Sequence, residues 1–82
     1  KVESWSVYPN PAKEYVMLKA LNTGNFKQYT YELYDIKGSL QYSNSIKNFE
    51  TKVNIEFLKN GVFTIVIKNG ILPVFISKII KK

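Results

Sequence analysis

The feature that most constrains this chain is its division into short extended segments by turn residues. Stretches rich in Pro, Gly and Asn interrupt the sequence about every eight to twelve positions, which is the spacing typical of β-sandwiches and β-barrels. Between these stretches apolar and polar residues alternate, most clearly in residues 51–56, as expected for strands with one buried face. The pattern favours a chain built from strands, and no segment predicts a helix.

Seven segments carry the strand pattern. Residues 62–68 are apolar on both faces and predict a central strand, whereas Pro73 predicts an edge strand, because proline cannot donate to a ladder. We therefore predict an all-β fold, specifically an antiparallel immunoglobulin-like β-sandwich of about seven strands in one domain spanning residues 1–82. The expected strands are residues 2–8, 15–21, 28–35, 40–42, 51–56, 62–68 and 73–80.

The run Tyr8-Pro9-Asn10-Pro11 ends the first expected strand. Each proline fixes its own φ and lacks an N–H donor, and each biases the residue before it toward extended geometry. We interpret these four residues mainly as a rigid strand exit. A role in recognition by a partner is the alternative.

Three further motifs predict turns. Asp35 and Gly38 stand first and last in a four-residue turn that fits a type I hairpin with glycine in the left-handed position. Asn69-Gly70 is a strong hairpin signal. Leu58, Gly61 and Phe63 have the spacing of a sandwich corner that often carries Tyr, and Phe63 would hold that corner by packing alone.

Composition excludes several kinds of chemistry. The chain has no Cys and no His, which removes thiol nucleophiles, disulfides, Cys/His zinc sites and the commonest general base. The six carboxylates show no paired spacing, and neither a phosphate-binding loop nor a nucleophile motif is present. We therefore expect a protein that is not an enzyme and has no cofactor or metal. The carboxylates are Glu3, Glu14, Glu32, Asp35, Glu50 and Glu56.

The net charge of +6 comes entirely from Lys. Arg is the residue that most often recognises bases and phosphates, so its absence argues against a nucleic-acid partner. The sequence contains no run near the roughly 18 apolar residues of a membrane span, so we expect no membrane insertion. Because the chain starts at Lys1 without Met, we expect it to be an excised piece of a larger protein or a processed product.

Taken in order, five motifs resemble one family, the type IX secretion C-terminal sorting domain, also called the Por secretion tail. One departure is Phe63, where that family more often carries Tyr. The motifs cover nearly the whole chain: Val7-Tyr8-Pro9-Asn10-Pro11-Ala12-Lys13, Tyr31-Glu32-Leu33-Tyr34-Asp35-Ile36-Lys37-Gly38, Val53-Asn54-Ile55, Leu58-Lys59-Asn60-Gly61-Val62-Phe63 and Lys78-Ile79-Ile80-Lys81-Lys82.

The resemblance implies a sorting signal that directs an N-terminal cargo protein across the outer membrane of a Gram-negative bacterium. The domain would meet the outer-membrane secretion machinery in the periplasm, and a sortase-like peptidase would cleave it on export. The cargo would then reach the cell surface or the extracellular space.

The resemblance places the recognition element at the chain end, in Lys78, Ile79, Ile80, Lys81 and Lys82. We expect an edge strand there whose backbone could pair with a partner strand while its lysines meet carboxylates. The same lysines could instead be ordinary solvated surface.

The alternative function is a surface binding module for carbohydrate or protein that uses exposed aromatic rings. We favour the view that most of these rings pack in the core or across strands. The candidate rings are Trp5, Tyr29, Tyr34 and Tyr42.

Overall fold

The computed structural model describes residues 3–82, which form seven strands without a helix. The all-β prediction is confirmed. Val2, part of the first expected strand, lies outside the described residues. The strands are β1 Trp5–Tyr8, β2 Tyr15–Ala20, β3 Tyr29–Tyr34, β4 Leu40–Ser45, β5 Glu50–Asn54, β6 Gly61–Asn69 and β7 Leu72–Lys81.

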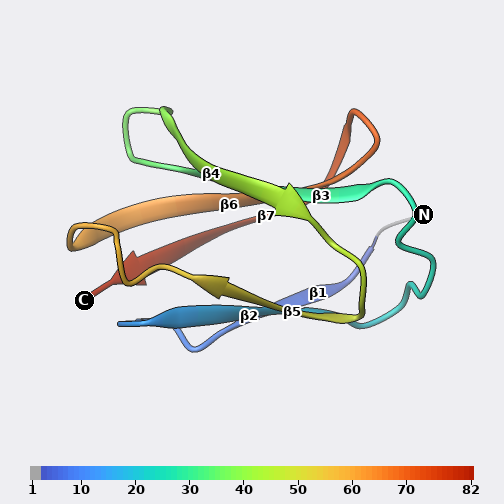
Figure 1. Ribbon diagram of the computed structural model, residues 1–82, viewed down its shortest axis with the longest axis horizontal. Helices are drawn as coiled ribbons and strands as arrows, with labels where there is room; N and C mark the ends of the chain where they lie inside the picture. The colour runs from blue at the N-terminus through green and yellow to red at the C-terminus, as the bar shows by residue number, and fades with distance from the viewer. Residues whose placement is uncertain (1–2) are drawn as a thin grey trace.

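The strands form two antiparallel sheets that face each other as a sandwich (Figure 1). One sheet has the order β1-β2-β5 and the other the order β4-β3-β6-β7. In the constant-type immunoglobulin arrangement the fourth strand joins the sheet of the first, second and fifth. Here β4 pairs with β3 in the larger sheet instead. The predicted immunoglobulin-like sandwich is confirmed with this assignment of its fourth strand.

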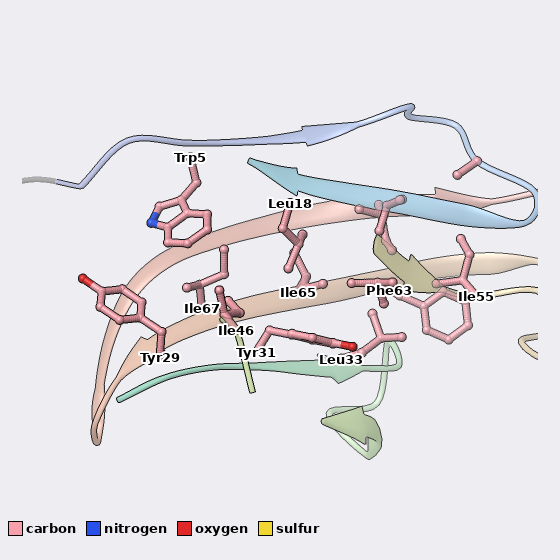
Figure 2. Close-up of a cluster of buried hydrophobic side chains, with 14 of the residues drawn as sticks. Trp5, Leu18, Tyr29, Tyr31, Leu33, Ile46, Ile55, Phe63, Ile65 and Ile67 are labelled. Atoms are coloured by element: carbon pink, nitrogen blue, oxygen red, sulfur yellow. The ribbon is translucent and has the colours of Figure 1, made fainter. Parts of the chain in front are cut away.

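Strand alternation builds the core between the two sheets. In β3, β6 and β7 most residues facing the smaller sheet are buried, and several have no accessible surface, including Leu33, Ile65 and Ile79. Phe75 and Ser77 of β7 are half-buried. The smaller sheet contributes Val16, Leu18 and Val53 in the same way. Aromatic rings close one end of this core, where Trp5 and Tyr29 lie together, while Phe63 and Ile55 lie at the other end (Figure 2).

The strands at the C-terminal side have the predicted positions in the sheet. β6 lies between β3 and β7, so it is central, and β7 forms the edge beyond it. Pro73 lies opposite Lys68, next to an irregularity in the register after Ile67. An edge strand tolerates this arrangement because the missing N–H of a proline can face away from the ladder.

The β6–β7 turn differs by one residue from the expected Asn69-Gly70 position. Asn69 pairs with Leu72, so Gly70 and Ile71 are the central residues of the turn. Gly70 has a φ of 64° and Ile71 does not have a positive φ. This combination is that of a type II′ turn, which places glycine first and needs only one residue in the left-handed region.

Candidate recognition site

The five residues proposed for recognition form the end of β7 and the residue that follows it. Their side chains alternate between the two faces of the sheet. Lys78, Ile80 and Lys82 are exposed, whereas Ile79 is fully buried and Lys81 is 8% exposed. The ammonium of Lys81 donates to the carbonyl of Lys82 at 3.2 Å. The charge of Lys81 is therefore held at the inner face, and of the three lysines in this segment only Lys78 and Lys82 are exposed.

The register with β6 dictates this alternation. Phe63 pairs with Ile79 and Gly61 with Lys81, so both β7 residues share the inward side of Phe63. Cross-strand partners always point to the same face of a sheet. A lysine two residues after a buried isoleucine must then begin its course inside the sandwich, where its methylene groups can pack before the charged end reaches a polar atom.

The side chain of Asn10 binds the free edge of β7. Its Nδ2 donates to the carbonyl of Lys78 at 3.2 Å, and its Oδ1 accepts the N–H of Ile80 at 2.9 Å. Both peptide bonds that precede the flanking prolines are cis. Through its two hydrogen bonds to β7, the Asn10 carboxamide donates and accepts where the N–H and C=O of a paired peptide group would.

Ala12 continues this pairing with its backbone. Its N–H donates to the carbonyl of Ile80 at 2.9 Å, and its carbonyl accepts the N–H of Lys82 at 2.8 Å. Ala12 and Lys81 form a parallel bridge. We call Asn10 and Ala12 together the edge clasp. The clasp occupies the outer edge of residues 78–82, so the expectation that this strand edge could pair with a partner strand is wrong. The edge from Leu72 to Ser77 has no such cover among residues 3–82.

The other motif residues build turns and the sandwich corner. The carboxylate of Asp35 accepts the N–H groups of Lys37 and Ser39 at 2.9 and 2.8 Å. Gly38 closes the turn with a φ of 85°. Leu58 and Phe63 are both buried, as a corner held by packing requires. Tyr8, by contrast, remains exposed at the end of β1.

The aromatic residues considered for a binding platform do not form one. Trp5 and Tyr29 are buried and pack against Phe26 with ring centroids 5.6–6.1 Å apart. Tyr42 is partly exposed but packs against two other rings, and Tyr34 is half-buried. The prediction that most of these rings are core or cross-strand contacts agrees with their positions.

One charged network lies on the outer face of the larger sheet. The Lys68 ammonium is 3.0 Å from the Glu32 carboxylate, which also accepts the hydroxyl of Tyr34. The Tyr34 hydroxyl and then Lys68 lower the pKa of Glu32, and the Glu32 carboxylate raises the pKa of Tyr34. Each group thus has a partner that stabilises its ordinary charge state, which favours a structural role.

In the described part of the chain, no cluster of three acidic, His or Cys residues could bind a metal ion. The same residues include no helix suited to crossing a membrane.

Comparison with known proteins identifies the family. Residues 6–82 match the family described as the secretion system C-terminal sorting domain. The chain belongs to this family of type IX secretion sorting domains. No curated protein and no solved structure matched the chain.

Family membership gives the function of this sorting domain. Such a domain is the C-terminal signal of a cargo protein handled by type IX secretion. The presence of this signal implies that the cargo is exported across the outer membrane to the cell surface or extracellular space of a Gram-negative bacterium. The alternative of a separate surface binding module is not supported.

Sequence reasoning did not foresee the edge clasp of this sorting domain. Asn10 is separated from its partners by 68 and 70 positions, and no local pattern reports such a contact. One signal was nevertheless present: an Asn between two prolines has a side chain that can replace the backbone hydrogen bonds its neighbours cannot make.

Proposed function

We propose that this sorting domain acts without catalysis and is recognised through its C-terminal segment, Lys78 to Lys82, by the outer-membrane secretion machinery. The domain would follow an N-terminal cargo, pass through the periplasm with it, and be removed by a sortase-like peptidase on export. No nucleic acid, cofactor or membrane insertion is needed for this role.

The observation that carries the proposal is the exposed face of the segment. Lys78, Ile80 and Lys82 point outward from an ordered strand, while Ile79 and Lys81 anchor the same strand in the sandwich. A folded domain can thus present two charges and one apolar group in a constant arrangement. Preorganised groups of this kind bind with less loss of conformational entropy than a flexible tail would.

The contacts of three acidic residues support a non-catalytic role, because each of the three serves the structure. Glu3 accepts from Trp5 and Tyr29, and Glu32 pairs with Lys68. The Asp35 carboxylate organises its turn. Carboxylates engaged in this way are poor candidates for acid–base chemistry, which requires a group free to exchange its proton with a substrate.

The test uses a periplasm-targeted reporter that carries this chain at its C-terminus, in a host with type IX secretion. Changing Lys78 and Lys82 together to Ser should reduce the exported fraction of the reporter, because it removes both outward charges at constant chain length. The matched control changes Lys37 and Lys59, which are also exposed, to Ser. Export that falls equally for both pairs would show that only total charge matters and would contradict recognition through this segment.

Cleavage is followed in the same experiment by mass spectrometry of the exported reporter. Removal by a peptidase should shorten the product by approximately the mass of the sorting domain. A product that keeps the intact domain would contradict the cleavage step while leaving export itself established.

A further inference from the structure

The edge clasp restricts how a partner can contact the C-terminal segment. Asn10 and Ala12 already form hydrogen bonds with the backbone groups at the free edge of Lys78, Ile80 and Lys82. A partner strand would need these same groups for pairing. On the other side, β7 pairs with β6 through Lys81. A partner strand could therefore add here only by displacing the clasp, so contact with the folded domain must use side chains.

Apolar side chains gather on the outer face next to this segment. Ile80 is 45% exposed and pairs across the strands with Val62, which is 37% exposed. Ile76 is 62% exposed and pairs with the half-buried Val66. These two cross-strand pairs form two apolar patches on one face of β6 and β7, and the pair Thr64 and Lys78 lies between them.

Two lysines of the C-terminal segment lie beside these apolar patches. Lys78 lies between Ile76 and Ile80 on the outer face, and Lys82 follows Ile80. Within residues 3–82 neither ammonium forms an ion pair, whereas Lys68 on the same sheet is neutralised by Glu32. Unpaired positive charges next to apolar patches favour a partner with carboxylates at the matching positions, because complementary potentials orient the encounter.

We propose that the outward side chains of Val62, Ile76, Lys78, Ile80 and Lys82, here called the β7 outer surface, form a docking surface for a protein. The partner's contact surface has apolar side chains that meet the two apolar patches, and carboxylates that meet Lys78 between them and Lys82 at one end. This inference rests on the proposed function and deepens it, since it makes the docking element a folded face that includes β6 rather than a linear C-terminal tail.

In such an interface the buried apolar side chains supply most of the affinity, and the matched charges supply specificity. Ile71 and Leu40 are exposed apolar residues outside this surface. Ile71 lies in a hairpin turn and Leu40 on the outermost strand of the same sheet. They provide controls that are more exposed, at 89% and 53%, than Ile76 and Ile80, at 62% and 45%.

The test compares two double variants of the reporter fusion. Ile76→Ser with Ile80→Ser should lower the exported fraction at least about tenfold, as expected when two apolar anchors leave an interface. Ile71→Ser with Leu40→Ser should leave it unchanged. Thermal melting of the 82-residue chain confirms that both variants fold. Equal export of the two variants would overturn the inference, and export of the parent fusion in that case would leave the proposed function standing.

Charge reversal tests the chemistry of the partner. Lys78→Glu with Lys82→Glu should reduce export further than the same positions changed to Ser, because repulsion from partner carboxylates adds to the lost attraction. Equal export of the Glu and Ser variants would overturn the inference that the partner's contact surface is acidic. Self-association of the purified chain that disappears with Ile76→Ser and Ile80→Ser would overturn it as well, since the occupant would then be a second copy.

Discussion

Replacement of Asn10 tests whether one side chain substitutes for a backbone peptide group. Asn10→Ala removes both hydrogen bonds to β7, at 3.2 and 2.9 Å. At about 0.5–1.5 kcal/mol for each bond, the free energy of unfolding should fall by about 1–2 kcal/mol, toward the lower end because the site is exposed. For a domain of this size such a loss lowers the melting temperature by about 4–16 °C.

Asn10→Asp refines the test, because it keeps the acceptor for the Ile80 N–H and loses the donor to the Lys78 carbonyl. Its carboxylate would also face that carbonyl oxygen without a hydrogen between them. An unpaired buried acceptor carries a desolvation penalty, but both groups here can reach water. We therefore expect Asp to destabilise the chain by an amount comparable to Ala rather than by more.

The assay is amide hydrogen exchange followed by NMR on the 82-residue chain. Asn10→Ala should speed exchange of the Ile80 amide by roughly tenfold, the factor that corresponds to one lost hydrogen bond. The Ile79 amide is the internal control, because strand alternation directs it toward β6. Asn48→Ala is the control variant, since Asn48 is exposed and has no hydrogen bond among those of the described residues. Unchanged Ile80 exchange and melting temperature in Asn10→Ala would refute the reasoning.

Three further changes test the fold around the site. Ile79→Ala should cost about 2–5 kcal/mol of unfolding free energy and Ile80→Ala less than about 1 kcal/mol, because Ile79 is fully buried and Ile80 is 45% exposed. Equal losses of free energy in urea unfolding would contradict the alternation of β7. Gly38→Val should destabilise the chain by about 1–3 kcal/mol through the φ of 85° alone, since a Cβ there meets no atom within 4 Å. Lys37→Val should not destabilise it. Equal melting temperatures of the two variants would mean that the turn is misassigned. Burial, and then Tyr42, raises the pKa of Tyr31 to about 12 from about 10 in the unfolded chain. The stability that this shift contributes is therefore complete below pH 10 and is lost as the pH rises toward 12. Tyr31→Phe should make the decline of stability between about pH 10 and 12 shallower, and identical declines would argue against the shift.

The strands themselves could be predicted from local pattern because alternation and turn chemistry are local. β6 and β7 were expected within one residue of their observed bounds. β4 runs three residues further than expected, to Ser45. Its polar end, Ser43-Asn44-Ser45, looks like a loop because an outermost strand that is exposed along its whole length has no apolar alternation to mark it.

The site could be predicted only in part, because its geometry depends on contacts between distant segments. Family resemblance places recognition at the chain end, and residue type alone makes Lys81 a surface residue. The register between β6 and β7 overrides residue type and turns Lys81 inward. The clasp of Asn10 on Ile80 likewise arises only when the sandwich brings the first loop beside the last strand.

The most direct test of the central claim is the location of a periplasm-targeted reporter with and without this chain at its C-terminus. The two fusions are expressed in a host with type IX secretion and in the same host lacking the outer-membrane channel of that system. With the chain present and the channel intact, the reporter should appear at the cell surface or in the medium, and in the other three combinations it should stay in the periplasm. A reporter distributed identically with and without the chain in the secreting host would contradict the assignment of this domain as a sorting signal.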